Sequence, residues 1–364
     1  MKDYKICIYC ICKNESKFVD RFMDAVDELK EHVYVLDTGS TDNTVELFKK
    51  RKAHVYQKKY EHFTFDLARN DALNLVPEKY DICISLDIDD VIRKGFVDAI
   101  RNIWDETTTQ MEYMYYYTVD KNDNPIVKHK LNKIHSRKNF KWIYPVHEVL
   151  QYTGMHSNVK YTDDILVVHK PDCAKSRSFY LDILEERVMN VPDDSRNIFL
   201  LAREYQRVGR WLDGLKMCHK YLDHKDFCYM PERLNIKCYL ARIYRSLKMY
   251  EESELWADKA IADKINTRNP YLEKLITCYE SEQYYKAIEA GLEALRITEY
   301  NTDVIDMMEC WNGTIYDYIA LAYYYINDYD NAIRYVDMDI ELNPNNERLK
   351  NNRAIFVSKK TEQN

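Results

Sequence analysis

Three aspartates after a short apolar run are the residues of this sequence best suited to chemistry. Residues 82–92 read Ile-Cys-Ile-Ser-Leu-Asp-Ile-Asp-Asp-Val-Ile, so Asp87, Asp89 and Asp90 follow a segment typical of a buried parallel strand. The carboxyl ends of such strands are where open α/β sheets bind ligands. Because Asp87 and Asp89 point the same way on an extended chain, they predict a site for a hard cation, Mg²⁺ or Mn²⁺.

The same aspartates also have a purely structural interpretation. Aspartate is a favoured residue at the N-terminus of a helix, and a helix is expected to begin near Lys94, so Asp89 and Asp90 would cap it. The stretch alone favours neither interpretation. The choice depends on the elements that surround it.

Short strands and helices alternate in the first half of the chain. The pattern predicts strands at residues 5–12, 32–36, 53–57 and 82–86, and helices at 17–29, 44–50 and 65–75. Strands and helices in turn, with short links, indicate a parallel α/β sheet. Beyond Asp90, residues 111–119 and 125–134 are expected to be antiparallel strands of a mixed sheet, and a strand at 164–168 precedes a helix at 175–190.

The composition excludes several classes of protein. Apolar residues make up 46% of the 364, which excludes wholesale disorder, and the net charge of −7 argues against a protein that holds nucleic acid through its phosphates. Only Gly39 lies among the first 90 residues, so a phosphate site there cannot be a glycine-rich loop. No apolar run reaches the roughly 18 residues of a membrane helix, and no signal peptide is expected.

The 10 cysteines are scattered, and several lie within apolar runs. This usage indicates reduced thiols in a cytoplasmic protein rather than a disulfide framework. Cys7 and Cys10 form a C-x-x-C inside an expected strand, without a second pair at zinc spacing, so we expect no metal or redox role for them.

From about Pro192 onward the chain is expected to be all helical and loosely repetitive. A small residue stands three positions after an aromatic at 214, 253, 287 and 332, which are 39, 34 and 45 residues apart. This pattern resembles tetratricopeptide repeats, with a period of about 34 residues, whose stacked helix pairs form concave surfaces that bind polypeptides. The alternative is a bundle that stabilises the first domain or forms a homodimer. The expected domains are residues 1–190 and 191–364.

The motifs of the first domain, taken in order, resemble family 2 glycosyltransferases with the GT-A fold. The resemblance covers roughly residues 4–180 and rests on Lys13-Asn14-Glu15, Leu36-Asp37-Thr38-Gly39-Ser40-Thr41-Asp42-Asn43-Thr44, Leu67-Ala68-Arg69-Asn70, Leu86-Asp87-Ile88-Asp89-Asp90 and Val146-His147-Glu148. It implies a Rossmann-like mixed sheet followed by the helical repeats. Some members with this arrangement glycosylate peptides or proteins.

The resemblance implies a role for each matching residue on the donor side. Asp37 is expected to read the uracil ring of a UDP-sugar, although a turn-forming aspartate is the alternative, and Glu15 is expected near the nucleoside. Arg69 would point from its helix toward the nucleotide. Asp87 would contact the ribose or a metal-bound water, and Asp89 would bind the metal ion that holds the donor diphosphate. Asp90 is left with the helix-cap role.

The acceptor side needs a general base, for which the resemblance offers a His-Glu pair. Glu148 is the first candidate and His147 its rival, although either could instead orient the acceptor. His169, at the end of an expected strand, matches a metal- or diphosphate-binding histidine found late in related domains, and a histidine in a polar loop is the alternative. Lys175 and Arg177 could neutralise the diphosphate, and a surface position is the alternative for them.

Together these features predict a cytoplasmic, metal-dependent glycosyltransferase of the inverting type. It would transfer glucose or N-acetylglucosamine from a UDP-sugar to a side chain of a peptide or protein held by the helical repeats. One alternative keeps the chemistry and changes the acceptor to a saccharide, a lipid-linked glycan or a modified DNA base. The other is a catalytically inactive repeat protein that only binds a nucleotide-sugar. The acidic charge balance argues against DNA.

Overall fold

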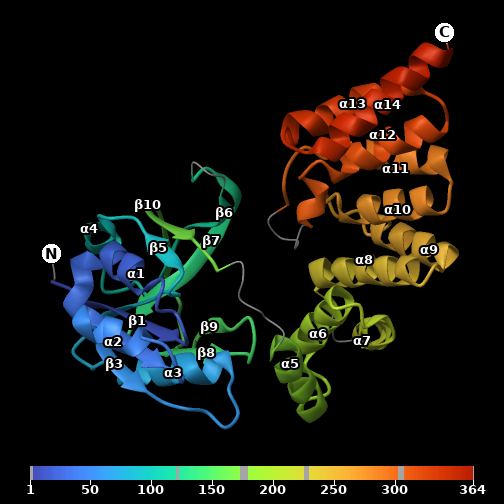
Figure 1. The fold of residues 1–364 in the computed structure, drawn as a ribbon. Helices are drawn as coiled ribbons and strands as arrows, with labels where there is room; N and C mark the ends of the chain where they lie inside the picture. Colours follow the sequence, from blue (N-terminus) through green and yellow to red (C-terminus); the bar gives the residue numbers. More distant parts are fainter. Residues whose placement is uncertain (1–2, 120–122, 173–178, 225–228, 302–306, 364) are drawn as a thin grey trace. The chain divides into compact units, whose positions relative to one another are not determined.

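The computed structural model divides into two compact units, residues 1–183 and 184–364. The division lies within helix α5 (Phe179–Asn190), and the boundary expected from the sequence falls at the end of that helix. Figure 1 shows a sheet-containing first unit and a helical second unit. The structure describes residues 3–119, 123–172, 179–224, 229–301 and 307–363.

The first unit is built on one mixed sheet of eight strands in the order β3-β2-β1-β4-β7-β6-β10-β5, with a separate hairpin β8-β9 (Figure 1). Strands β1 to β4 are mutually parallel, β7 runs antiparallel to both β4 and β6, and β5 pairs antiparallel with β10. The mixed sheet is therefore confirmed. The bounds of the strands are β1 Ile6–Cys12, β2 Val33–Asp37, β3 His54–Gln57, β4 Ile82–Ser85, β5 Asp90–Ile92, β6 Gln110–Val119, β7 Pro125–Ser136, β8 Phe140–Ile143, β9 Val149–Tyr152 and β10 Val159–His169.

Helices cover the sheet because its parallel strands are apolar on both faces. Ile8 and Cys10 of β1 belong to one buried cluster, with α1 (Val19–Ala25) and α4 (Phe96–Ile103). Cys7 and Tyr9 belong to the opposite cluster, with α3 (Phe65–Leu75) and the β8-β9 hairpin. Cys7 and Cys10 therefore point to opposite faces of the sheet, and both are buried thiols without a disulfide.

Several elements differ from the sequence prediction. The helix expected at residues 17–29 ends at Ala25, and a 3₁₀-helix follows from Asp27 to His32. The strand expected at 164–168 is longer, from Val159 to His169.

The expected cap at Asp89 and Asp90 is wrong. Asp90 begins strand β5, and the next helix, α4, starts only at Phe96 after Gly95, which has a φ of 90°. The two carboxylate oxygens of Glu28 accept hydrogen bonds from the N–H groups of Gly95 (2.5 Å) and Val97 (3.3 Å) at this end of α4. The acceptor at the start of the helix therefore comes from a residue far away in the sequence.

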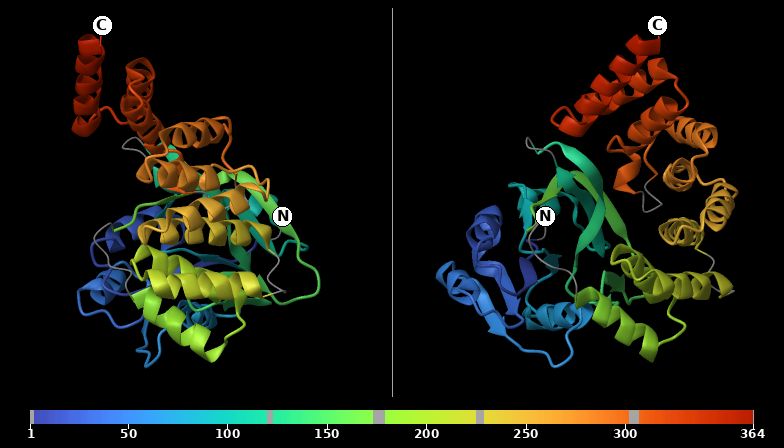
Figure 2. Two further views of the ribbon diagram at one scale, coloured as in Figure 1. Left: turned by 90° about the vertical axis from the view of Figure 1, so that its right-hand side faces the viewer. Right: turned by 45° about the vertical axis from the view of Figure 1, so that its right-hand side comes forward.

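The second unit consists of helix pairs that follow one another along the chain and pack side by side, as Figure 2 shows. The second helix of each pair begins at the aromatic residue of the sequence repeat. The small residue three positions later is buried in every pair, because it lies where neighbouring helices approach closely. The helices are α6 Ser195–Arg207, α7 Trp211–Asp223, α8 Met230–Ser246, α9 Tyr250–Ile261, α10 Asn269–Glu280, α11 Tyr284–Leu295, α12 Thr314–Tyr325, α13 Tyr329–Leu342 and α14 Glu347–Gln363.

The repeat predicted from sequence is thus present as four pairs, α6/α7, α8/α9, α10/α11 and α12/α13, followed by α14. Gly214 illustrates the close packing: a Cβ atom there would lie 2.9 Å from Cδ1 of Ile243 in the next pair. Within the described ranges, no helix combines the length and apolar character that crossing a membrane requires.

Candidate functional site

Arg69 is the centre of a buried charge cluster in the first unit. It lies on α3, is 4% exposed, and donates from Nε to Oε1 of Glu148 and from Nη2 to Oδ1 of Asp87 (2.5 Å). Its guanidinium also lies 5.0 Å from the centre of the Trp142 ring. A buried guanidinium is stable only when its charge is compensated, and the two carboxylates compensate it. The structure therefore brings together three residues that the sequence motifs singled out.

Lys133 is a member of this cluster that sequence analysis did not identify. It lies on β7, beside β4, and its Nζ is 3.0 Å from Oδ2 of Asp87. Burial by itself would raise the pKa of Asp87, but the charges of Arg69 and Lys133 hold that pKa well below its usual range. Asp87 is thus a carboxylate whose two oxygens both face cations, so it is better placed to orient a ligand than to bind a metal ion alone.

Asp89 and His169 form the second group of the site. The Nε2 atom of His169 lies 3.3 Å from Oδ2 of Asp89, and the imidazole stacks on the ring of Tyr117 at 5.2 Å between centroids. Burial would lower the pKa of His169, but the hydrogen bond and negative charge of Asp89 raise it. The two side chains come from a loop after β4 and from the end of β10, and the pairing of β5 with β10 brings them together.

Asp90 supports the loop from inside. Its carboxyl group is 2% exposed, accepts a hydrogen bond from the backbone N–H of Asp87 (3.1 Å) and another from the hydroxyl of Tyr115 (2.8 Å). Burial and the nearby charge of Asp87 raise the pKa of Asp90 to about 7. Asp90 therefore fixes the backbone between the other two aspartates and does not face a ligand.

The donor atoms at Asp89 and His169 fit a divalent cation that is completed by a ligand. Within the described ranges, no group of three or more His, Cys, Asp or Glu side chains could hold a metal ion. One carboxylate and one imidazole leave several coordination positions for water and phosphate oxygens, which is the way Mg²⁺ and Mn²⁺ are usually bound beside phosphates. The site is therefore suited to a metal ion that arrives with a diphosphate.

Asp37 lies at the end of β2, next to β1, where Cys12 pairs with it. Its side chain is fully buried, and Oδ1 accepts hydrogen bonds from the backbone N–H groups of Gly39 and Ser40, both at 3.1 Å. Gly39 has a φ of 113°, a conformation that glycine adopts readily. Asp37 thus shapes the turn after β2, as its alternative interpretation predicted, and the uracil contact stays a prediction.

Two loops beside Asp37 are joined by hydrogen bonds between them. The N–H of Asn14 donates to the hydroxyl of Ser40 (2.8 Å), and the N–H of Glu15 donates to the hydroxyl of Thr44 (2.8 Å). Asp42 accepts hydrogen bonds from the backbone N–H and the hydroxyl of Thr44 at the start of α2 (Thr44–Lys50), so it supports this end of the helix. These contacts hold the backbone of Glu15 beside the turn that Asp37 shapes, and the contact of Glu15 with the nucleoside stays a prediction.

The His-Glu pair lies in the turn between β8 and β9. Glu148 points to Arg69, as described above, whereas His147 is exposed and has a φ of 53°. Consecutive residues in such a turn face different directions, so only Glu148 joins the buried cluster. Lys175 and Arg177, the expected diphosphate-binding residues, lie outside the described residues.

A hydrogen-bonded chain behind the cluster holds Trp142 under Arg69. The indole N–H of Trp142 donates to the hydroxyl of Tyr9 (2.8 Å), and this hydroxyl lies 2.9 Å from Nε2 of His135. The side chain of Asn70 bonds both backbone groups of Trp142, at 2.8 and 2.9 Å. Asn70 stands in the same motif as Arg69, so that motif positions the charge and the aromatic ring beneath it.

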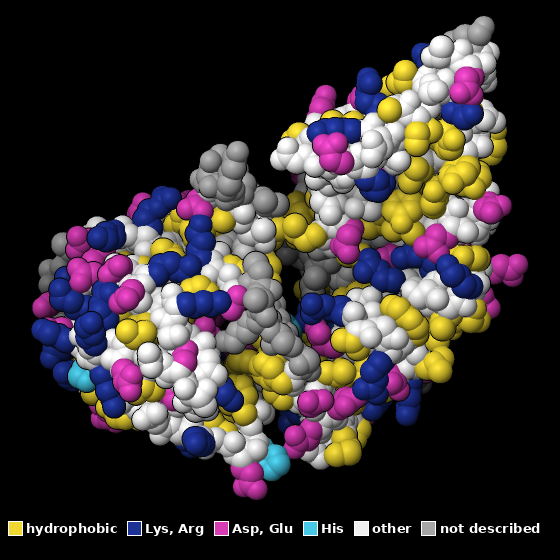
Figure 3. Space-filling model, in the orientation of Figure 1, with side chains coloured by type: hydrophobic (Ala, Val, Ile, Leu, Met, Phe, Trp, Pro, Cys, Tyr) yellow, Lys and Arg dark blue, Asp and Glu magenta, His cyan; other side chains and the backbone are white. Residues whose placement is uncertain are grey.

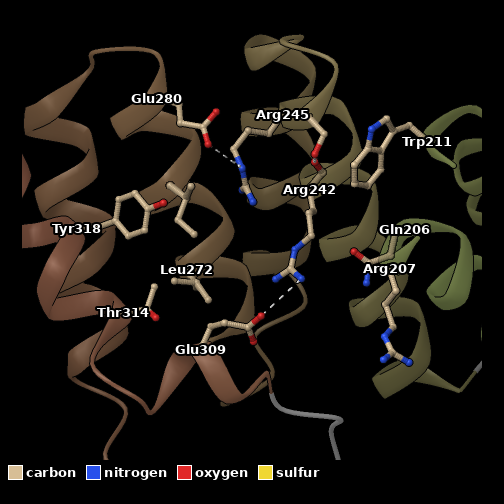
Figure 4. A pocket seen from close by; sticks show the side chains of 12 residues that line it. Gln206, Arg207, Trp211, Arg242, Arg245, Leu272, Glu280, Glu309, Thr314 and Tyr318 are labelled. Carbon is tan, nitrogen blue, oxygen red and sulfur yellow. Dashed lines mark hydrogen bonds and ion pairs between the residues drawn. The ribbon is translucent and has the colours of Figure 1, made fainter. Parts of the chain in front are cut away.

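The helical unit contains a pocket of about 580 Å³ (Figure 4). Arg242 and Arg245 share the fully buried carboxylate of Glu273, at 2.7 and 2.6 Å. Figure 4 shows their guanidinium groups directed toward two acidic side chains, at 3.9 Å from Glu309 and 3.7 Å from Glu280. The pocket is lined by Gln206, Arg207, Trp211, Arg242, Arg245, Ser246, Leu272, Ile276, Glu280, Glu309, Thr314 and Tyr318.

Comparison with known protein families gives a match within the first unit. The model of glycosyl transferase family 2 matches residues 7–163, which hold Arg69, Asp87, Asp89 and Glu148. No curated protein matches the chain.

Solved helical-repeat structures match the chain at low similarity. They include MamA (16% identity, 45% of this chain and 86% of that chain, TM-score 0.37) and TTC0263, a thermophilic TPR protein of Thermus thermophilus (16%, 49% and 88%, TM-score 0.37). Another is the Cut9–Hcn1 hetero-tetramer of APC/C, with 12% identity over 50% of this chain and 33% of that chain, at a TM-score of 0.42.

Proposed function

We propose that this protein, whose residues 7–163 form a glycosyl transferase family 2 domain, is a metal-dependent, inverting hexosyltransferase. It transfers glucose or N-acetylglucosamine from a UDP-sugar to a side chain of a peptide or protein. The observation that carries the proposal is the position of Asp89 and His169 next to the cluster of Asp87, Arg69 and Glu148. A cation site beside fixed positive charges and a carboxylate is what the transfer of a sugar from a diphosphate requires.

The UDP-sugar donor would be held by positively and negatively charged groups. Asp89 and His169 would hold Mg²⁺ or Mn²⁺, which when bound stabilises the negative charge that develops on the diphosphate. Asp87, kept ionised by Arg69 and Lys133, would accept hydrogen bonds from the ribose or from water on the metal. The turn at Asp37 would face the uracil ring.

The transfer itself is a single displacement at the anomeric carbon. The acceptor hydroxyl or thiol forms a bond to this carbon while the bond to the diphosphate oxygen breaks, and UDP leaves with the electron pair. Glu148 takes the acceptor proton as general base. Arg69 contacts Oε1 of Glu148 and holds the carboxylate at a fixed position during the reaction. Inversion follows because the acceptor attacks from the side opposite to the leaving UDP.

The side chains of the helical unit favour a polypeptide as the acceptor. Its pocket combines guanidinium groups, carboxylates and the aromatic rings of Trp211 and Tyr318, which suit the mixed surface of a peptide. Hydrophobic side chains also reach the surface of this unit, among them Leu255, Tyr285 and Tyr325, and Figure 3 shows yellow side chains over its helices. Exposed apolar groups of this kind suit a protein partner, either the acceptor or a second copy of the chain.

Donor hydrolysis tests the proposal most directly. We expect UDP release from UDP-glucose or UDP-N-acetylglucosamine in the presence of Mn²⁺, and loss of the activity with EDTA. Asp89→Ala should reduce UDP release by at least about a hundredfold, because one of two protein ligands is lost. Absence of both UDP release and Mn²⁺-dependent UDP binding for every UDP-sugar would refute the enzymatic function. Full activity of Asp89→Ala would refute only the metal assignment.

A further inference from the structure

Arg21 of α1 contacts the two chain segments that carry Asp89 and His169. Its Nη2 donates to the backbone carbonyl of Lys170 (2.9 Å) and lies 3.5 Å from the carbonyl of Asp89. The N–H of Lys170 in turn donates to the carbonyl of Asp89 (2.8 Å). One guanidinium thus contacts Asp89 itself and also Lys170, the residue next to His169.

The segments that Arg21 contacts are weakly held by the sheet. Strand β5 has three residues and lies at the edge of the sheet, where it pairs with β10. Its last rung toward the site is the pair Asp90–His169, so Asp89 lies just beyond the ladder. A short edge strand opens easily, because few backbone hydrogen bonds close it.

The guanidinium of Arg21 is itself fixed in place. Its Cζ atom lies 4.5 Å from the centre of the ring of Phe18, a residue that is 9% exposed. The Nε atom of Arg21 is buried without a hydrogen-bond partner among the described residues. The side chain is therefore held by the bonds to the two carbonyls and by the stacking on Phe18, and not through Nε.

We infer that Arg21 is a positioning residue for the metal site: together with the backbone bond from Lys170 to Asp89, it holds the end of the β5–β10 ladder and so sets the separation of Asp89 and His169. The inference rests on the proposed function, because it concerns the two residues proposed to hold the metal ion. Arg21 does not touch the cation or the donor. It acts through the backbone, by keeping the carboxylate and the imidazole close enough to bind one ion together.

The charge of Arg21 is compatible with this role. Its guanidinium lies at the backbone side of the loop, and its hydrogen bonds go to carbonyl oxygens and not to the carboxylate of Asp89. The side chain of Asp89 therefore stays available for the cation. A lysine at position 21 keeps the positive charge but lacks the rigid planar guanidinium that stacks on Phe18, so it should hold the two carbonyls less firmly.

The test compares Arg21→Ala and Arg21→Lys with the wild-type protein, by calorimetric titration of Mn²⁺ in the presence of UDP. We expect Arg21→Ala to weaken the apparent affinity for Mn²⁺ about tenfold or more, as removal of a supporting group around a metal does, and Arg21→Lys to weaken it less. The rate of UDP release by Arg21→Ala should recover at saturating Mn²⁺, since no reacting group has been removed. A variant that had lost a reacting group would stay slow at saturating Mn²⁺.

Arg51→Ala is the matched control. Arg51 also binds α1, through Asp20 (2.9 Å) and Asp24 (2.5 Å), and both of these acidic side chains belong to the helix rather than to the loop of Asp89. We expect Arg51→Ala to leave the Mn²⁺ affinity unchanged. Equal affinity of the wild-type protein and Arg21→Ala would overturn the inference and leave the proposed function intact. Absence of Mn²⁺ binding by the wild-type protein would refute the metal site and the inference with it, and equal losses in Arg21→Ala and Arg51→Ala would assign the effect to α1 as a whole.

Discussion

At the scale of single residues, the site is organised by charges that compensate one another. Arg69 is buried between Asp87 and Glu148, and Lys133 adds a second positive charge on Asp87. Because unpaired buried charges are costly, each of these residues depends on the others for its position. The cluster is a fixed electrostatic environment, ready before a ligand binds, which is what a transfer reaction requires.

The proposed role of Glu148 as general base can be tested separately from its contact with Arg69. Glu148→Gln keeps an oxygen for the N–H of Arg69 but cannot take a proton, so we expect the transfer rate to fall about a hundredfold. The affinity for UDP and Mn²⁺, measured by calorimetry, should stay close to that of the wild-type protein. His147→Gln is the control, since His147 is exposed. An unchanged rate in Glu148→Gln together with a large loss in His147→Gln would assign the base to His147.

His135 predicts a dependence of stability on pH. It is fully buried, its Nδ1 lies 2.8 Å from the carbonyl of Ser136, and burial lowers its pKa to about 4. Between this pKa and the ordinary value of about 6.5, only the unfolded chain binds the proton, so the free energy of unfolding falls as the pH falls. From pH 7 to 5 we expect a loss of about 2 kcal/mol from this residue.

Urea denaturation at pH 7 and pH 5 measures this loss. His135→Gln removes the titrating group, so its free energy of unfolding should fall by about 2 kcal/mol less than that of the wild-type protein over the same range. The variant is expected to be less stable at pH 7, because the hydrogen bond to Tyr9 changes. Equal pH dependence in both proteins would mean that His135 is not neutral in the folded state.

At the scale of elements, the active loops are held by residues from other parts of the chain. The loop after β4 is held by Asp90 and Arg21, and the loops after β1 and β2 are joined through Asn14 and Ser40. Helix α4, which follows the loop of Asp89 and β5, has Glu28 at its N-terminus. Loops on a rigid scaffold carry function in many folds, and here the scaffold holds them by long-range hydrogen bonds.

The contact of Glu28 with α4 can be measured as stability. Glu28 supplies acceptors for two N–H groups and a negative charge at the positive end of the helix, so Glu28→Ala should lower the free energy of unfolding by about 1 kcal/mol. Glu31→Ala is the control, because Glu31 forms an exposed ion pair with Lys52 at 3.6 Å. We expect a change below about 0.5 kcal/mol for this control. Similar losses in both variants, in urea denaturation, would contradict the assignment.

At the scale of the whole molecule, catalysis and acceptor binding are expected to be divided between the units. The family match covers residues 7–163 of the first unit, and the 580 Å³ pocket lies within the second. Each unit has its own buried clusters of apolar side chains, so a small change in one pocket need not affect the other unit. The two steps should therefore respond to different substitutions.

Trp211 tests this division. Trp211→Ala removes an aromatic wall of the pocket, so transfer to a peptide or protein acceptor should fall at least about tenfold, a typical effect of losing one interface aromatic. Metal-dependent hydrolysis of the UDP-sugar should be unchanged. Leu212→Ala is the matched control, because Leu212 is the next residue of α7, is 73% exposed and does not line the pocket. If Trp211→Ala transfers sugar to the acceptor as well as the wild-type protein does, the pocket is not the acceptor site.

Local patterns in the sequence were enough to predict most elements and the family model that matches residues 7–163. Helix α3 was predicted with its observed bounds, and the helix pairs of the second unit begin at the aromatic residues of the repeat. These features depend on the period of apolar residues and on short motifs, which are properties of neighbouring residues. Arg69 and Asp87 were both singled out by these motifs, but the hydrogen bond between them was found only in the structure.

Contacts between distant segments could not be predicted from local sequence patterns. Lys133 meets Asp87 across 46 residues, Glu28 meets Gly95 across 67, and Arg21 meets Lys170 across 149. A lone Lys, Glu or Arg in a sequence has no local signal that distinguishes it from a solvated surface charge. Its partner depends on the order of the strands and their register, such as Ile84 opposite Ile134 and Asp90 opposite His169. The sequence motifs therefore identify candidate residues of the site, whereas the partner of each residue is set by the order and register of the strands.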